Sequence, residues 1–260
     1  MKKIMLVFSV FFLLMQTVSA DQLYKKHDWY FRPNGNNQPI LFEDKQFPYK
    51  YGAIAMGSPD DKVVYLTYDA GYPSENLIKI LDIHKEQNVP AAFFILPAVI
   101  DKAPEIIERF VKEGHIVGNH SYSHKDMSAI TEKDEFQKEL TALEDMYYTI
   151  TGYEMSKYFR PPEGSFSEQN LIYCFELGYI PTFWSFAYAD WDNNSQKNPE
   201  WAKKKILDNL HNGMVMLLHP NSATNALIIN DIITEIKSRG YRFGTLDELK
   251  EYNEGKNSIN

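Results

Sequence analysis

Apolar and polar residues follow one another in a repeated strand-then-helix pattern from residue 62 onward. The pattern begins with the apolar run from Val63 to Tyr68, which predicts a buried strand. Ser74 predicts the start of a helix, because a serine side chain can accept hydrogen bonds from free backbone N–H groups. The apolar face of this helix comprises Leu77, Ile80, Leu81 and His84.

The same pattern continues to the end of the chain. Further strands are predicted at residues 92–96, 115–118, 158–159, 179–185, 214–218 and 241–243. Helices are predicted from Pro104 to Gly114, Thr131 to Gly152, Ser167 to Gly178, Pro199 to Gly213, Ala226 to Gly240, and onward from Thr245. The second of these would bury Phe136, Leu140, Leu143, Tyr147 and Ile150. A repeated β-then-α order predicts an α/β fold with a parallel sheet, either open or closed into a barrel.

The first twenty residues do not fit this pattern. They combine Lys2 and Lys3, an apolar stretch from Ile4 to Met15, and the small residues Val18, Ser19 and Ala20. This order is typical of a secretory signal peptide, and the apolar stretch is shorter than the roughly 20 residues that span a membrane. We therefore expect residues 1–20 to be removed and the protein to be secreted, to an extracytoplasmic or cell-wall location, without a stable membrane anchor.

Residues 21–60 are irregular, with an aromatic group at Trp29-Tyr30-Phe31 followed by turn-forming residues. We interpret this segment as an arm wrapped on one main domain at residues 61–251. Hydrophobic residues make up 44% of the chain, which is enough for a sizeable core.

The formal charge is −8, or −10 once Lys2 and Lys3 are removed with the signal. A negative chain argues against a nucleic-acid partner, which favours a basic surface. Cys174 is the single cysteine, so no internal disulfide can form, and its helical pattern places it on an apolar face as an inert thiol. We expect a monomer.

Ionisable and other polar side chains follow five of the predicted strands. Because the carboxyl ends of parallel strands meet at one rim, these side chains are expected to converge there. A lone histidine is more often a structural hydrogen-bonding residue than a ligand, but convergence of all five groups favours a functional site. The residues are Asp69, then Asn119, His120 and His124, then Arg160, then Asp190 and Trp191, and finally His219.

The residue types suggest hydrolysis of an amide or ester. His120 and His124 are four residues apart, a spacing that on a helical turn places two imidazoles on one side, as Zn²⁺ or a similar divalent ion requires. Asp69 could act as general base, kept ionised by Arg160. His219, oriented by Asp190, could donate a proton to a leaving group.

These segments resemble the motifs of the polysaccharide deacetylases, the NodB-homology domain of carbohydrate esterase family four. TYDAG resembles TFDDG, HSYSH resembles HSxxH, RPPEG resembles RPPxG, ADW resembles the Asp-Trp motif, and LLHP resembles the last histidine motif. The resemblance covers about residues 61–250. It implies a distorted (β/α) barrel and metal-assisted removal of acetyl groups from sugars.

Residue by residue, the resemblance gives Asp69 as catalytic base with Arg160 as the residue that tunes it. Asp190 and His219 match the acid side. His120 and His124 match metal ligands, the metal being a divalent ion such as Zn²⁺. Trp191, Leu217 and Tyr72 are the expected substrate-binding residues, the first two as walls of the acetyl pocket.

Within the family, the aromatic arm and five segments resemble the delta-lactam-biosynthetic muramic-acid de-N-acetylases of spore-forming bacteria. The segments are LTYDAGY, EGHIVGNHSYSH, YFRPPEGSFSE, FWSFAYADWDNNSQKNP and LLHPNSATN. That branch acts on peptide-stripped N-acetylmuramic acid on the way to the muramic δ-lactam of spore cortex. Two positions depart from the family: Ala70 replaces the metal-binding aspartate, and Ala187 replaces the first acid of DxxDW. The metal site is therefore expected to be weak or incomplete.

Two alternatives stay open. The chain could deacetylate another polysaccharide, such as chains of N-acetylglucosamine. It could also be a catalytically silent carbohydrate-binding protein that has kept the groove, although Asp69, Arg160, Asp190 and His219 are all retained.

Overall fold

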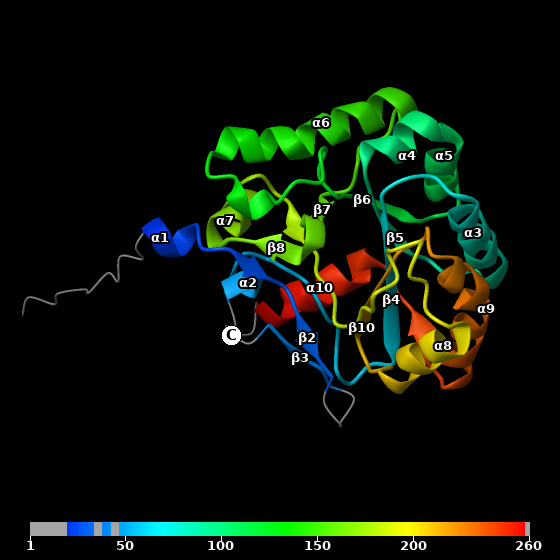
Figure 1. Ribbon diagram of the computed structural model, residues 1–260. Helices are drawn as coiled ribbons and strands as arrows, with labels where there is room; N and C mark the ends of the chain where they lie inside the picture. The colour runs from blue at the N-terminus through cyan, green and yellow to red at the C-terminus, as the bar shows by residue number, and fades with distance from the viewer. Residues whose placement is uncertain (1–19, 34–37, 43–46, 258–260) are drawn as a thin grey trace, which may run out of the picture.

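A curled parallel sheet forms the centre of the molecule (Figure 1). The computed structural model describes residues 20–33, 38–42 and 47–257. All neighbouring strands of this sheet are parallel, and β11 (Arg242–Phe243) also pairs with the start of β4. The strand order is β10 (Met214–Leu218), β4 (Val63–Ala70), β5 (Ala92–Ile95), β6 (Ile116–Asn119), β7 (Tyr158–Phe159) and β9 (Ile180–Pro181).

The two outer strands of the sheet, β9 and β10, come together through the segment that follows β9. Phe186 in this segment forms an isolated parallel bridge with Met216 of β10. The predicted α/β fold with a distorted barrel is thereby confirmed. The predicted strand at residues 179–185 is much shorter than expected, because its second half makes isolated bridges instead of a continuous ladder.

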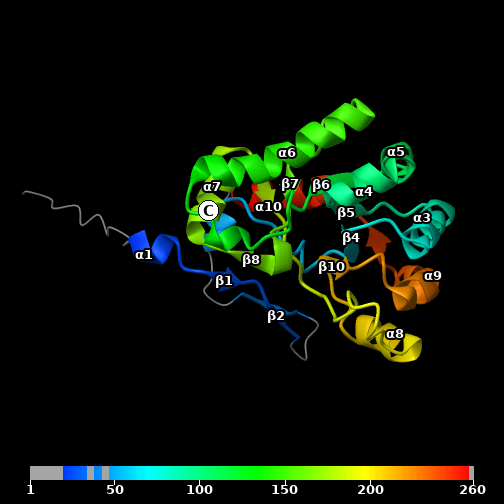
Figure 2. The same ribbon diagram turned by 45° about the horizontal axis from the view of Figure 1, so that its top comes forward.

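Helices surround the outside of the curled sheet (Figures 1 and 2). In chain order they are α3 (Glu75–Gln87), α4 (Pro97–Lys102), α5 (Pro104–Lys112), α6 (Lys133–Thr151), α7 (Glu168–Glu176), α8 (Pro199–Asp208) and α9 (Ala223–Ser238). The last helix, α10 (Leu246–Asn257), packs Leu246 and Leu249 against Val63, Tyr65 and Val215 at the strand beginnings. An apolar layer thus fills the barrel at the beginnings of the strands, and the predicted site residues lie at the opposite, carboxyl ends.

Strand β4 contributes side chains both to the apolar cluster beneath the outer helices and to the apolar cluster inside the barrel. Side chains of a strand point alternately to opposite faces. Val64, Leu66 and Tyr68 belong to the large cluster that includes residues of the outer helices, whereas Val63 and Tyr65 belong to the inner cluster. Asp69 shares the inner face by this alternation, so the fold directs its carboxylate into the barrel.

Local sequence signals predicted most helix boundaries. Ser74 caps α3, and Ser167 forms a reciprocal capping box with Asn170 at the start of α7. Two expectations for α6 were wrong. Glu132 occupies the N-cap position, without a side-chain cap bond, in place of Thr131. Ile150 is half exposed, because it lies in the last turn of α6, beyond the buried stripe that ends at Tyr147.

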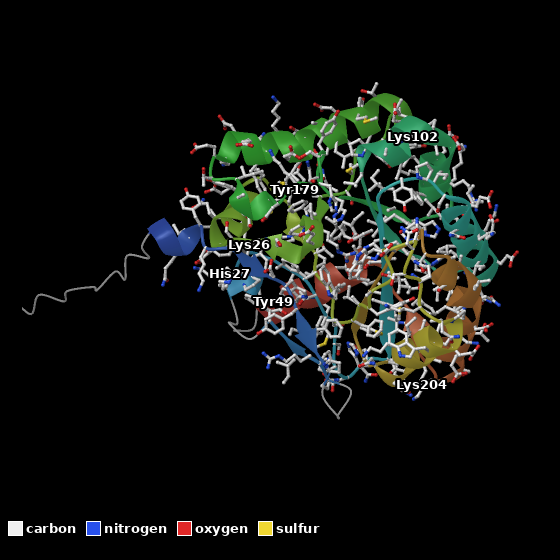
Figure 3. The ribbon with its side chains drawn as sticks, in the orientation of Figure 1. Lys26, His27, Tyr49, Lys102, Tyr179 and Lys204 are labelled. Carbon is white, nitrogen blue, oxygen red and sulfur yellow. The ribbon has the colours of Figure 1, made fainter. Side chains whose placement is uncertain are left out.

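The arm packs on the main domain through an aromatic cluster. It contains α1 (Ala20–Leu23), β1 (His27–Asp28), β2 (Phe31–Arg32), β3 (Ile40–Leu41) and α2 (Phe47–Lys50), and β1 pairs antiparallel with β8 (Ser165–Phe166). Trp29 stacks on Phe183 with 4.3 Å between ring centroids, and its indole N–H donates to the Trp184 carbonyl at 2.8 Å. Figure 3 shows Lys26, His27 and Tyr49 together on this side of the molecule, away from Lys204 of α8.

Three further expectations concern features outside the sheet. The predicted signal peptide at residues 1–20 lies outside the described residues except for Ala20. Within the described ranges, no helix combines the length and apolar character needed to span a bilayer. Cys174 is buried, and burial raises the pKa of its thiol, as expected for an inert cysteine.

We predict that Trp29→Ala lowers the free energy of unfolding by about 3–5 kcal/mol, because it removes a buried indole from the arm's aromatic cluster. Urea denaturation followed by circular dichroism measures this loss. Tyr148→Ala, which truncates a half-exposed aromatic residue of α6, is the control and should change stability by less than about 0.5 kcal/mol. Equal stability of the Trp29 variant and the wild type would show that the arm does not contribute to the fold.

Candidate active site

A buried ion pair joins two of the predicted site residues. Asp69, near the end of β4, accepts a hydrogen bond on Oδ1 from Nη1 of Arg160 at 2.7 Å. Arg160 follows β7 directly and is fully buried. Burial alone would raise the pKa of Asp69, but the charges of Arg160, His120 and His219 outweigh it and hold this pKa below its usual value. Asp69 is therefore ionised at neutral pH and suited to accept a proton.

The guanidinium of Arg160 is held in place on all sides. Its Nε donates to the carbonyl of Thr182 at 3.1 Å, and Nη2 donates to Oγ1 of Thr67 at 2.8 Å. The ring of Phe94 lies beneath it, 4.1 Å from Cζ. A buried guanidinium with this many partners is fixed in orientation, so its Nη1 stays directed at Asp69.

His120 and His124 are brought together by a loop and not by a helix. Ser121 and His124 both have positive φ angles, 69° and 53°, so the helical-turn basis of the predicted pairing is wrong. The Oγ of Ser121 instead accepts the backbone N–H of His124 at 3.0 Å and closes the loop. The two imidazole centroids lie 5.1 Å apart at an interplanar angle of 73°. Backbone strain of this kind is concentrated at functional sites.

His120 faces Asp69 with its free ring nitrogen. Its Nδ1 donates to the carbonyl of Arg160 at 2.8 Å, which leaves Nε2 unprotonated and 3.5 Å from Oδ2 of Asp69. Burial lowers the pKa of His120 to about 4. His120 is accordingly neutral and available as a ligand or a hydrogen-bonding group.

A second pair, Asp190 and His219, stands at the end of β10. Nδ1 of His219 donates to Oδ1 of Asp190 at 2.7 Å, and the backbone N–H of His219 donates to Oδ2 at 2.9 Å. Burial lowers the pKa of His219, but the hydrogen bond and charge of Asp190 outweigh burial, and the net pKa is raised. A raised pKa favours the protonated imidazole, which is the form that a general acid requires.

The three expected substrate-binding residues have different environments. Leu217 is buried in β10 and pairs in register with Thr67 of β4, so it shares the inner face with Asp69. Trp191 is 59% exposed, with its ring 5.9 Å from that of His219. Tyr72 is also exposed, and its hydroxyl accepts a hydrogen bond from the side chain of Asn193 at 2.8 Å. Aromatic side chains exposed beside a titrating pair can stack against a sugar ring.

The residues present do not form a three-ligand metal site. Ala70, which stands where the TFDDG motif has its second aspartate, is fully buried in an apolar cluster and has no side-chain oxygen. Across the described part of the chain, no three His, Cys, Asp or Glu side chains are grouped so that they could hold a metal ion. His120 and His124 offer two imidazole nitrogens, fewer than the three protein ligands of a typical catalytic zinc centre.

Thr67 and Asn225 are site residues that sequence reasoning missed. Thr67 is hidden within an apolar strand, but it links Arg160 to β10 by donating to the Met216 carbonyl at 2.9 Å. Asn225 lies near the start of α9 and donates to Oδ2 of Asp190 at 2.6 Å. Both residues lie in segments that carry the family resemblance, but no local pattern assigned them a role, because their partners are side chains distant in sequence.

Comparison with known proteins places this geometry among sugar deacetylases. Residues 56–182 match the polysaccharide deacetylase family. The chain is 38% identical over 230 residues to the peptidoglycan-N-acetylmuramic acid deacetylase PdaA of Bacillus subtilis, covering 85% of each protein. It is 34% identical over 202 residues to a peptidoglycan-N-acetylglucosamine deacetylase of Bacillus cereus, covering 76% of this chain and 72% of that protein.

A solved structure shows the same architecture. The structure of Bacillus subtilis PdaA, a family 4 carbohydrate esterase, aligns with a TM-score of 0.83 and 37% sequence identity, covering 87% of this chain and 97% of that one. The distorted barrel is therefore of the NodB-homology type.

We predict that Arg160→Leu destabilises the protein by about 3–5 kcal/mol at pH 7, because it leaves Asp69 as an uncompensated buried charge. In the wild type, the lowered pKa of Asp69 contributes stability that is lost only as the pH falls through that value. Without Arg160, burial raises this pKa instead, so the carboxyl takes up a proton and the penalty is smaller at pH 5 than at pH 7.

Urea denaturation of both proteins at pH 5 and pH 7 measures this difference. Arg242→Leu breaks an exposed pair with Glu248 and is the matched control, with an expected cost of less than about 1 kcal/mol at both pH values. A penalty for Arg160→Leu that is the same at both pH values would contradict the assignment of Asp69 as its dependent partner.

Proposed function

This chain belongs to the polysaccharide deacetylase family, and we propose that it hydrolyses N-acetyl groups on the amino sugars of peptidoglycan. The observation that carries the proposal is the presence of two hydrogen-bonded ionic pairs, Asp69 with Arg160 and Asp190 with His219, whose Asp69 and His219 stand at the ends of the neighbouring strands β4 and β10. The two pairs are coupled electrostatically, because the charges of Asp69 and His219 shift one another's pKa. Peptidoglycan as substrate is supported by the names of both relatives.

The reaction assigns a separate proton transfer to each pair. Asp69 accepts a proton from a water molecule as the water oxygen bonds to the acetyl carbonyl carbon. Asp190 holds the Nδ1 side of the His219 ring. His219 then donates its Nε2 proton to the sugar nitrogen as the C–N bond breaks. The products are acetate and a free amine, and no acyl-enzyme forms.

Three side chains would hold the acetyl group and sugar ring during these transfers. Leu217 lies on the inner face with Asp69 and is assigned to the acetyl pocket. Trp191, beside His219, forms the outer wall. Tyr72 is assigned to the sugar ring, since it is exposed and its hydroxyl is held by Asn193.

The specific substrate that we propose is N-acetylmuramic acid in glycan from which the peptide has been removed. The similarity to the Bacillus subtilis muramic acid deacetylase supports this choice. The freed amine lies beside the lactyl carboxyl of muramic acid and can close on it with loss of water, giving the muramic δ-lactam of spore cortex. Secretion through the signal peptide at residues 1–20 agrees with a wall substrate.

The Bacillus cereus relative supports a second substrate, N-acetylglucosamine, through the same chemistry. A silent carbohydrate-binding protein is disfavoured because both acid–base pairs are intact.

We predict that the protein removes one acetyl group per muramic acid residue from peptide-stripped glycan, and that Asp69→Asn lowers the rate by roughly 10²–10⁴-fold, as expected for loss of a general base. Mass spectrometry of the products gives both the acetyl loss and the sugar that carries it. Asp231→Asn, which changes an exposed carboxylate of α9, is the matched control and should retain wild-type activity.

Each alternative has its own result. Acetyl loss confined to N-acetylglucosamine would support the second substrate and overturn the first. Glycan binding without acetyl loss, in wild type and Asp69 variant alike, would support the silent protein. Near wild-type turnover by a folded Asp69→Asn protein would refute the base assignment.

Metal binding is a separate part of the proposal. We assign His120 and His124 as the side chains that would bind a divalent ion such as Zn²⁺, weakly, since Ala70 supplies no third ligand. Calorimetric titration of metal-free protein with Zn²⁺ should show binding that His124→Ala weakens by roughly 10-fold or more. His27→Ala, in the arm, is the control. Identical Zn²⁺ affinity of the His124 variant and the wild type would exclude this pair as the binding site.

A further inference from the structure

Asn225 occupies a buried position next to the pair of Asp190 and His219, six residues after His219 in the chain. It is the third residue of α9, and its side chain is fully buried. Its Nδ2 donates both of its hydrogens, one to Oδ2 of Asp190 at 2.6 Å and one to the backbone carbonyl of His219 at 3.1 Å. One amide group therefore contacts both members of the pair.

The orientation of this amide is fixed by a fourth residue. The hydroxyl of Tyr188 donates to Oδ1 of Asn225. A flipped amide would place its oxygen against the Asp190 carboxylate and its N–H₂ against a hydroxyl, and both changes cost hydrogen bonds. Tyr188 is itself buried and packs against Trp201 of α8. From the Tyr188 hydroxyl to Nδ1 of His219, each of these donors thus meets an acceptor, and a satisfied buried network of this kind is rigid.

We propose that Asn225 is a positioning residue for the general acid: it locks the Asp190 carboxylate so that Oδ1 stays on Nδ1 of His219, and Tyr188 holds Asn225 in the required orientation. Without this amide, Oδ2 of Asp190 keeps one donor, the backbone N–H of His219, and the carboxylate is free to rotate about its bond to Cβ. The His219 imidazole would then lose its partner for part of the time.

A purely structural role at the start of α9 can be separated from this one. The helix is capped by Ser222, whose Oγ accepts the backbone N–H of Asn225 at 3.1 Å. Asn225→Ala keeps that backbone bond and removes only the side-chain amide. Tyr188→Phe removes one hydroxyl and leaves all of Asn225 in place, so it tests the same network with little change in packing.

The inference rests on the proposed deacetylation, but its first test does not need a substrate. The groups that act on the titration of His219 are Asp190 and Asp69, which raise its pKa, and Arg160 and burial, which lower it. In Asn225→Ala the contribution of Asp190 falls, so the pKa of His219 should fall. Nitrogen-15 NMR of the His219 ring measures this in wild type and variant. Asn230→Ala, at an exposed position of the same helix, should leave the titration unchanged.

The second test is kinetic. In Asn225→Ala, kcat should fall roughly 10- to 100-fold through misplacement of the acid, with KM unchanged and with the high-pH limb of kcat moved to lower pH. Tyr188→Phe should cost roughly fivefold, the contribution of one neutral hydrogen bond. In an Asp190→Asn background, Asn225→Ala should have no further effect on kcat, since residues that act as a unit are not additive.

Two results would overturn the proposal. One is an unchanged pKa of His219 in folded Asn225→Ala, whatever happens to the rate. The other is a Tyr188→Phe protein with wild-type kcat and a wild-type pKa of His219. This second result is decisive if the Asn225→Ala protein does not fold. A protein that deacetylates no glycan would refute the proposed function and leave the NMR test of positioning intact.

Discussion

The ion pair between Arg160 and Asp69 is the interaction on which the rest of the site depends. The guanidinium binds Asp69 and Thr67 of β4 and the carbonyls of Thr182 and Phe183 in the segment after β9. These partners lie on opposite sides of the curled sheet, so one side chain ties the barrel together where catalysis is proposed. The carbonyl of Arg160 also fixes the tautomer of His120. Loss of the guanidinium would therefore change the base and the barrel wall together, while the backbone carbonyl that holds His120 would remain.

The pair of Asp190 and His219 is stabilised in the same way as the pair of Arg160 and Asp69, but by different groups. A fully buried charged group is stable only when its hydrogen-bonding capacity is met. Arg160 meets this condition with two strand-end carbonyls, a hydroxyl and a carboxylate, whereas Asp190 meets it with the imidazole and backbone N–H of His219 and the amide of Asn225. The two pairs draw their support from different parts of the chain, the segment after β9 for Arg160 and the start of α9 for Asp190.

Sequence patterns predicted the parts of this structure that depend on local physics. Periodicity and capping account for the alternation in β4 and the serine caps of α3 and α7. They also account for Asp69 near the end of β4 and for Arg160 and His219 directly after β7 and β10. The predictions failed where contacts between residues distant in the sequence determine the local structure. The histidine spacing suggested a helical turn, but hydrogen bonds of Asn119 and Ser121 close a strained loop instead. The role of Asn225 could not be predicted, because its partners Asp190 and Tyr188 lie 35 and 37 residues away in the chain.

The attachment of the arm has a consequence for the order of folding. Trp29 is synthesised early, yet its indole binds the carbonyl of a residue 155 positions later, and β1 pairs with β8 after a similar interval. Contacts across such a separation close a large loop and are made late, because the entropy of closure must be met before the contact stabilises anything. The N-terminal segment therefore has no docking surface until most of the barrel exists, and its aromatic residues stay exposed to other binding partners throughout that interval. The first segment would remain free until residues 164–184, which hold its partners, have been synthesised.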